Sequence, residues 1–426
     1  MARFRGKTPL PDGVEVPRER QLTLVERFDS FARRVESADP SKPAIALFCA
    51  VMALSALGLL MQASHAATTL SADQFWGQFG SQVRFRIVAI VALLVGFRLG
   101  PSGLRRFIPA LCVLSALALV LVFVPPFADP KNGAHRWLQI PGTGFSFQPS
   151  ELARIVVILW VADRCIRLGP AVRDLRRGVV PMLAFACVFF GLILVETDLG
   201  SAMLFLACAF GTMWVGGAQS MHVAGPVVGL GGSAFLVLVT FVSYVRQRLL
   251  MWFGASQNNQ VDRTADAMAS GDFFGVGLGQ GLFRNARVPY LETDYVLALV
   301  GEELGLFGVW LVLALLVAFI WFGLRFVLSI RDRYSALCAF GLLLSVALQA
   351  MVHVQVVTGL APPKGMPLPF ISHGGTALVV SSLAVGIALG AARSSAASAP
   401  AIVPSQPSAG DVPSVLHPEP RAALEP

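Results

Sequence analysis

Runs of about twenty apolar residues, the length that crosses a bilayer as a helix, recur along most of this chain. The chain is 55% hydrophobic and 14% charged, which lies outside the range of soluble globular domains. The sequence therefore predicts an all-α, polytopic membrane protein. About ten transmembrane helices are expected, at 44–64, 86–100, 106–125, 149–166, 179–195, 199–216, 222–244, 294–324, 334–358 and 376–393.

The arginines predict the orientation, because Lys and Arg are enriched in cytoplasmic loops. If ten spans are correct, the basic N-terminal region and three loops fall on one side. Those loops carry Arg98, Arg105, Arg106, Arg164, Arg167, Arg173, Arg176, Arg177, Arg325, Arg331 and Arg333. That side is expected to be the cytoplasm and to hold both termini. The net charge of +8 then reflects membrane topology rather than nucleic-acid binding.

Three segments are expected. Residues 1–43 are polar, without the apolar core of a cleavable signal peptide, so the first span should act as the targeting signal. Apolar residues at helical spacing between Leu24 and Val35 indicate either an amphipathic helix or a solvated linker. Residues 44–393 should form the membrane domain, and 394–426 a disordered cytoplasmic tail. The six cysteines lie in or beside apolar spans without CxxC spacing, which favours packing over metal or redox roles.

Most unusual polar residues lie in three loops that this topology places outside the cell: 126–148, 359–375 and the largest one, 245–293, between the seventh and eighth spans. The first leads into "QPSELARI". It holds Arg136 beside Trp137, a cation and an aromatic plane suited to phosphate and sugar. Ser150 could cap the following helix, with Glu151 favourable at its positive end. A binding role for Gln148, Ser150 and Glu151 is the alternative.

Further charged residues stand near the same side. Glu196 and Asp198 occupy a short break, "VETDLGSA", which could be merely a polar turn. Arg246 and Arg248 run against the usual charge bias of outer loops and are candidate anion ligands. The glycines of "FFGVGLGQG" follow no predicted strand, so they indicate tight turns rather than dinucleotide binding.

Acidic residues also lie at the beginning of the eighth span and within it. Asp294 stands where the outer loop meets this span, and a poorly solvated carboxylate there suits a general base. Glu302 and Glu303 lie about 12 Å deeper along a helix and are expected to pair within the bundle. In "GLAPPKGMPLPFISHGG" the prolines and glycines preclude a regular helix, so a re-entrant or surface loop should carry Lys364, Ser372 and His373.

These stretches share an order with a known family. "GAHRWL…FQPSELAR", "ETDLGSA", "VRQRL", "SGDFFGVGLGQG", "ETDYVLALVGEELG" and "PPKGMPLPFISHGG" resemble motifs of the FtsW/RodA/SpoVE family, the SEDS proteins, and are closer to FtsW. The resemblance covers 44–393. It implies a peptidoglycan glycosyltransferase of the bacterial cytoplasmic membrane that polymerises lipid II at the outer face, for division or elongation. Such proteins release undecaprenyl pyrophosphate and work with a class B penicillin-binding protein, a transpeptidase.

The resemblance also implies residue roles. Asp294 matches the proposed catalytic Asp. The expected substrate-binding residues are Arg136, Trp137, Gln148, Ser150, Glu151, Arg246, Arg248, Lys364 and Ser372. Supporting roles are expected for Asp198, Gln260, Glu302, Glu303, Pro367, Pro369, Gly374 and Gly375. The chain departs from the family pattern at Arg154, Tyr290, Glu292, Lys364 and His373, where the family usually has Lys, Glu, His, Thr and Tyr.

The implied reaction needs a base for the attacking hydroxyl and cations for the departing pyrophosphate. Asp294 would supply the first, and Arg136, Arg246, Arg248 and Lys364 the second. A divalent cation could assist; no metal ligands are assigned and no other cofactor is expected. Two alternatives remain. A lipid II flippase would use ionisable residues along a midplane path, for which Glu302 and Glu303 are the candidates. A weakly active division scaffold would be consistent with the altered loop residues.

Overall fold

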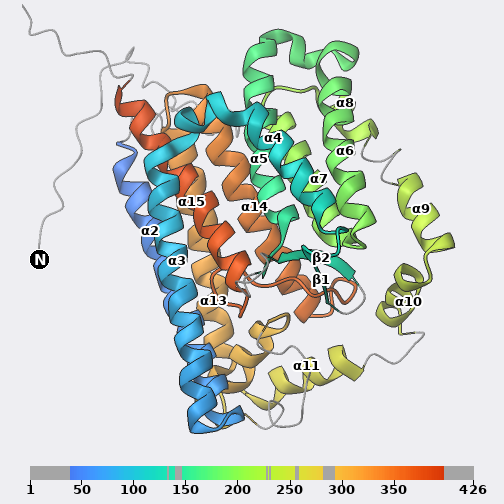
Figure 1. The fold of residues 1–426 in the computed structure, drawn as a ribbon. Helices are drawn as coiled ribbons and strands as arrows, with labels where there is room; N and C mark the ends of the chain where they lie inside the picture. Colours follow the sequence, from blue (N-terminus) through green and yellow to red (C-terminus); the bar gives the residue numbers. More distant parts are fainter. Residues whose placement is uncertain are drawn as a thin grey trace, which may run out of the picture.

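A computed structural model describes residues 39–131, 134–139, 146–226, 229, 232–254, 259–281 and 293–397. The possible amphipathic helix before residue 39 and the predicted tail after residue 397 lie outside the described residues. Within them the protein is mostly helical, with a small sheet beside the helices (Figure 1).

The long helices form a bundle, and shorter helices lie at its edge. The helices and strands are α2 (Ser41–Thr69), α3 (Ala72–Leu104), α4 (Ile108–Leu121), β1 (Ala128–Lys131), β2 (Ala134–Gln139), β3 (Ser146–Phe147), α5 (Pro149–Leu168), α6 (Val180–Val195), α7 (Leu199–Val215), α8 (Ser220–Pro226), α9 (Gly232–Phe241), α10 (Ser243–Trp252), α11 (Asn259–Ser270), α13 (Val296–Ser329), α14 (Arg333–Val357) and α15 (Gly375–Ala397).

Six helical stretches of the described chain are long and apolar enough to cross a membrane, which confirms a multi-pass membrane protein. One of them runs from Asp73 to Leu121 through α3 and α4. The helix α3 begins 14 residues before the apolar run predicted at 86–100. At 1.5 Å per residue its 33 residues extend about 50 Å, beyond a hydrocarbon core of about 30 Å. The predicted seventh span, 222–244, coincides with shorter helices instead: it overlaps α8 and contains α9.

Glycines allow α3 and α15 to lie backbone to backbone. A side chain on Gly96 would collide with Leu383 and Ile387 of α15, and one on Gly386 would collide with Leu93 of α3. Lipid provides no hydrophobic drive between two apolar helices, so close van der Waals contact through small residues stabilises such pairs.

The helix α13 is broken at Gly305, whose φ of 67° and ψ of −164° are not helical. The loop after α11 satisfies the backbone groups that the break releases. Val276 and Gly277 donate to the carbonyls of Glu302 and Glu303 at 3.0 and 3.1 Å. In return, Leu306 and Phe307 donate to the carbonyls of Asp272 and Phe273, also at 3.0 and 3.1 Å.

The buried acids Glu302 and Glu303 therefore stand beside the break. The Ser64 hydroxyl of α2 donates to Glu303 Oε2 at 2.6 Å, so Glu303 has a partner within the bundle. A side chain on Gly281 would collide with the Glu302 carboxylate, so this loop also covers Glu302.

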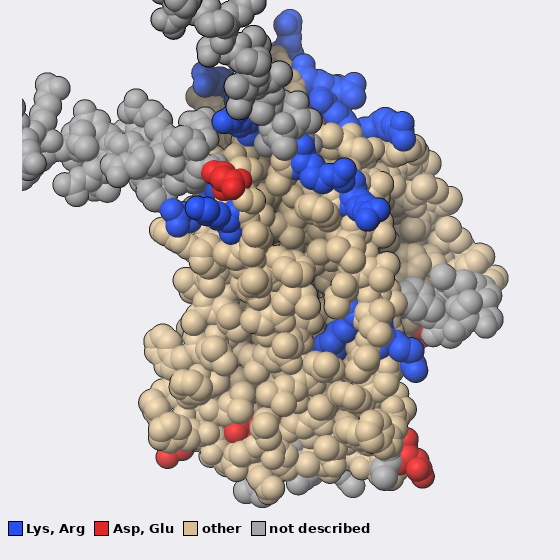
Figure 2. Space-filling model, turned by 90° about the vertical axis from the view of Figure 1, so that its left-hand side faces the viewer, with Lys and Arg blue, Asp and Glu red and all other residues tan. Residues whose placement is uncertain are grey.

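The two ends of the bundle differ. The helix α2 begins, and α15 ends, at the upper end in Figure 1, where the α3–α4, α5–α6 and α13–α14 connections also lie. On the face drawn in Figure 2, Lys and Arg gather mostly at this end, while acidic side chains are visible at both ends. The small sheet, the loop after α14 and α11 lie toward the second end.

The sequence did not predict the antiparallel sheet β1–β2–β3 in the first outer loop. Asp129 pairs with Trp137, and Leu138 pairs with both Ala128 and Phe147. The sheet matters for the site because it places Arg136 of β2 next to the turn before α7.

Candidate functional site

The loop between α14 and α15 forms the floor of the candidate site, and buried groups of α14 and α5 hold it in place. Gln349 Nε2 donates to the Pro367 carbonyl at 3.0 Å, and His353 Nδ1 donates to the Met366 carbonyl at 2.7 Å. Arg154 Nη2 donates to Gln349 Oε1 at 2.9 Å. Sequence reasoning missed Gln349 and His353, because a polar residue in an apolar run does not reveal which loop it contacts.

Asp198 joins three distant segments at this loop. Lys364 Nζ lies 3.2 Å from Asp198 Oδ1, and Gln148 Nε2 donates to Asp198 Oδ2 at 2.9 Å. The Ser201 backbone also donates to Oδ1, so the carboxylate caps α7 at the same time. Burial acts to raise the pKa of Asp198, but Lys364, Arg136 and the Ser201 hydrogen bonds outweigh it and hold this pKa well below its usual range. Asp198 is therefore a fixed anion among cations.

Three cations lie near one another at this loop, and two of them, Lys364 and Arg136, act on Asp198. Burial lowers the pKa of the Lys364 ammonium, and the charges of Arg136 and Arg248 lower it further, against the opposing effect of Asp198. Arg248 Nη1 donates to the carbonyl of Pro363, the neighbour of Lys364, at 2.7 Å. Arg136, Arg248 and Lys364 come from β2, α10 and the loop after α14, so folding creates a local excess of positive charge.

Asp294 lies against the same loop, immediately before α13. A side chain on Gly365 would collide with its carboxylate, so Gly365 allows the close approach. The neighbouring Tyr295 is buried, and the charges of both Asp294 and Arg248 act on it. The half-buried Asp294 carboxylate is thus next to the residue that follows Lys364.

Arg136 reaches the turn between α6 and α7. Its Nη2 donates to the Thr197 carbonyl at 2.8 Å, and Thr197 has a φ of 60°, which a threonine rarely adopts. Successive side chains of a strand point to opposite faces, so Arg136 and Trp137 do not present one shared surface. The backbone strain at Thr197 supports a functional turn, whereas the sequence alone favoured a simple polar one.

The beginning of α5 corrects one expectation. The helix starts at Pro149 with Gln148 at its N-cap, and no side chain forms a cap hydrogen bond. Ser150 is therefore not the cap; its hydroxyl accepts from Gln148 Nε2 at 3.0 Å. Glu151 lies in the first turn as expected and is buried, and the Gln148 amide links this turn to Asp198.

Other predicted residues lie away from the cations. Ser372 is 4% exposed and its hydroxyl accepts from the Leu368 backbone at 2.7 Å, which favours a structural role. Arg246 is exposed on α10, two residues before Arg248 and so on a different helix face. The remaining supporting residues stay predictions. Pro367, Pro369 and Gly374 belong to the loop, Gly375 begins α15 against the Phe85 ring, and the side chain of Gln260 lies outside the described part.

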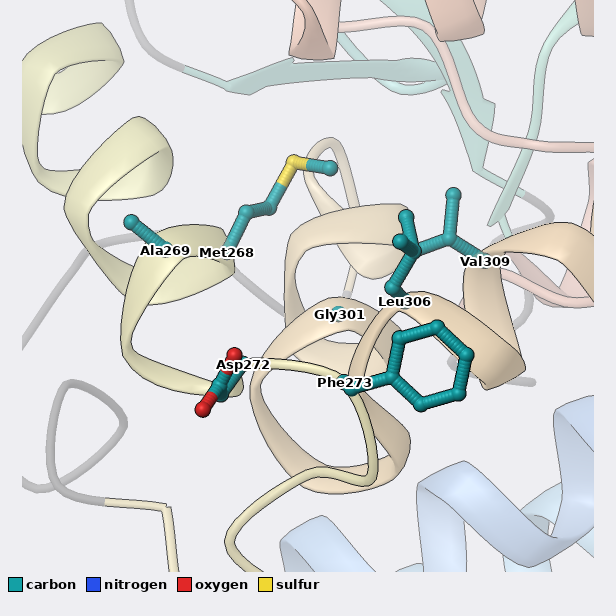
Figure 3. A pocket seen from close by; sticks show the side chains of 7 residues that line it. All are labelled: Met268, Ala269, Asp272, Phe273, Gly301, Leu306 and Val309. Carbon is teal, nitrogen blue, oxygen red and sulfur yellow. The ribbon is translucent and has the colours of Figure 1, made fainter.

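Within the described ranges, no group of three His, Cys, Asp or Glu side chains could hold a metal ion. The charge partner of Asp198 is the Lys364 ammonium, so these residues do not fit a metal centre at that carboxylate. Figure 3 shows a pocket of about 220 Å³ where α11 meets the break in α13, with a mostly apolar lining that includes Asp272. Met268, Phe273, Gly301 and Leu306 are among its lining residues, and none of the three cations lines it.

Comparison with known proteins gives consistent relatives. Residues 45–397 match the FtsW/RodA/SpoVE family, described as "Cell cycle protein". A "Probable peptidoglycan glycosyltransferase FtsW" of Geobacter metallireducens is 33% identical over 346 residues, 79% of this chain and 91% of that protein. "Stage V sporulation protein E" of Bacillus subtilis is 30% identical over 363 residues, 83% of this chain and 98% of that protein.

Solved structures share the fold. One chain belongs to a peptidoglycan synthase complex described as coordinating polymerization and crosslinking. It has a TM-score of 0.67 at 23% identity and covers 82% of this chain and 97% of its own. The rod shape determining protein RodA of Thermus thermophilus has a TM-score of 0.60 at 23% identity and covers 82% and 96%.

Proposed function

Because the chain belongs to the FtsW/RodA/SpoVE family of SEDS proteins, we propose that it polymerises lipid II into glycan strands with the groups assembled around Asp294 and Lys364. The chain is a peptidoglycan glycosyltransferase. One observation carries the site assignment: Arg136 and Arg248 act on Lys364, and the half-buried Asp294 carboxylate lies against the next residue of the same loop. This loop therefore brings a candidate base and a candidate anion-binding site together.

The proposed reaction exchanges one bond for another at a sugar carbon. A hydroxyl oxygen of one sugar attacks the anomeric carbon of the next, and the bond from that carbon to the pyrophosphate oxygen breaks. Asp294 takes the hydroxyl proton as general base, a role typically contributing about 10²–10⁴-fold. The cations bind the departing undecaprenyl pyrophosphate, since charge-assisted contacts to phosphate are strong. The lipid carries the activation, so no nucleotide site is required.

The membrane arrangement forms part of the proposal. We assign ten spans, with both termini and the arginine-rich connections in the cytoplasm and 245–293 as an extracytoplasmic loop between the seventh and eighth spans. The common end of α2 and α15 and the gathering of Lys and Arg there support this orientation. The site then faces outward, where a class B penicillin-binding protein would crosslink the new strands.

Purified protein, with its co-purified transpeptidase and fluorescent lipid II, tests the function directly. Glycan polymer resolved on a gel is expected. Asp294→Asn should lower the rate by about 10²–10⁴-fold, because the amide keeps the shape but cannot accept the proton. Protein yield and partner binding should stay near wild type, since the amide keeps the size and polarity of this half-buried side chain.

Two outcomes would contradict this assignment. Lipid II that crosses liposome membranes without forming polymer would support a flippase instead. An Asp294→Asn protein that polymerises within a few-fold of the wild-type rate would remove Asp294 as the base while leaving the enzyme class intact.

A further inference from the structure

Glu196 is a fully buried acid whose two carboxyl oxygens both lack a hydrogen-bond partner among the described residues. It is the C-cap residue that follows α6, one residue before Thr197 and two before Asp198. A buried carboxylate without a partner is costly, so such a group requires an explanation. Its role was not predicted, because the sequence does not reveal that one acid of the "ETD" turn is engaged and the other is not.

A complementary group lies nearby. The Nε–H of Arg136 is buried and also lacks a hydrogen-bond partner in the described structure. Arg136 and Glu196 interact electrostatically, yet they form no ion pair; the guanidinium donates to the Thr197 carbonyl instead. The Arg136 Nε–H donor and the two Glu196 carboxyl oxygens form no hydrogen bond with each other. This is consistent with an uncharged Glu196, which would attract the guanidinium only weakly.

We propose that Glu196 is a positioning residue that acts through Arg136: as an uncharged carboxyl it leaves the guanidinium free for the substrate pyrophosphate, and as a carboxylate it pairs with the guanidinium and withdraws it. The inference rests on the proposed function, because it assigns a purpose to Arg136 within that site. Glu196 itself is fully buried and does not touch the substrate.

The surroundings determine the charge of Glu196. Burial, with the charge of Asp198, raises the pKa of Glu196 to about 9, and Arg136 opposes this rise. Asp198 stays charged because Lys364 and Arg136 stabilise it. The charge of Asp198 also acts on Glu151 of α5, and the charge of Arg248 acts on Lys364. Glu196 is therefore uncharged below about pH 9 and becomes charged above it, where its attraction for Arg136 increases.

The test measures initial polymerisation rates against lipid II concentration from pH 7.5 to 10. In the wild type, KM should rise above pH 9 and reach about tenfold its neutral value at pH 10, one unit above the pKa, because a tenth of the protein then keeps the uncharged acid. Glu196→Gln preserves the uncharged shape, so its KM should rise less than that of the wild type; the rise that remains belongs to Lys364, whose pKa is also lowered. Glu303→Gln removes a buried acid elsewhere, and its remaining activity should keep the wild-type profile.

A second variant covers the possibility that Glu196→Gln does not fold. Arg136→Ala should bind lipid II weakly at every pH, and its KM should show only the smaller alkaline rise that comes from Lys364, because no guanidinium remains to be withdrawn. The same alkaline rise in either variant as in the wild type would overturn the inference while leaving the polymerase function standing. No polymer at any pH would instead contradict the proposed function itself.

Discussion

Lys364 can reach Asp198 because residue 200 has no side chain. A methyl group at Gly200 would overlap the Lys364 ammonium, and the three nearest atoms to that position all belong to Lys364. The lysine end is flexible, so it would move rather than the helix. A substitution at Gly200 can therefore disturb the ion pair without changing either of its two residues.

Gly200→Ala should therefore displace the ammonium and lower polymerisation toward the level of Lys364→Met. Loss of a charged contact of about 1.5–3 kcal/mol corresponds to about 10–100-fold in rate or affinity. Thermal unfolding should be affected less than activity, because alanine favours the helix by up to about 1 kcal/mol over glycine and offsets part of the lost contact.

Gly191→Ala is the matched control, since nothing lies within 4 Å of the position its methyl group would occupy in α6. If Gly200→Ala polymerises at the wild-type rate while Lys364→Met is impaired, the contact between Lys364 and Asp198 is not the one that matters.

At the scale of elements, the break in α13 depends on one glycine. Gly305 combines a φ of 67° with close approach to Phe273, whose carbonyl would lie 2.6 Å from an added Cβ. Gly305→Ala should therefore lower the unfolding free energy by about 1–3 kcal/mol from backbone strain, plus the collision. Thermal unfolding in detergent measures the loss. Gly103→Ala in α3 meets open space and should unfold like the wild type; equal stability of both variants would refute the break.

Apolar runs predicted the long helices well, because a helix in lipid must be continuous and apolar. They underestimated α3, whose first turns carry Asp73, Gln74 and Gln78 and so read as a loop. Packing, which no local pattern shows, decides such segments. The same limit applies to the site: Asp198 and Lys364 were both singled out, but their contact joins residues 166 positions apart and could not be derived from spacing.

For the whole molecule, the distribution of charge predicts sidedness. Arg263 is exposed on α11, and Arg176 is exposed between α5 and α6, at the arginine-rich end. In a Cys49→Ser background, Arg263→Cys should react with an impermeant thiol reagent in intact cells. Arg176→Cys should react only after permeabilisation. Equal labelling, or the reverse pattern, would refute an outward-facing site.

The exchange of hydrogen bonds at Gly305 has a consequence for biosynthesis. Residues 272–277 leave the ribosome before residues 302–307. The loop segment that hydrogen-bonds to the break in α13 has therefore been synthesised before the break itself. Until they meet, four backbone groups of α13 have no helical partner, and each would cost several kcal/mol in lipid. The second half of α13 should therefore settle into the membrane only together with the preceding loop, as one step of assembly rather than two.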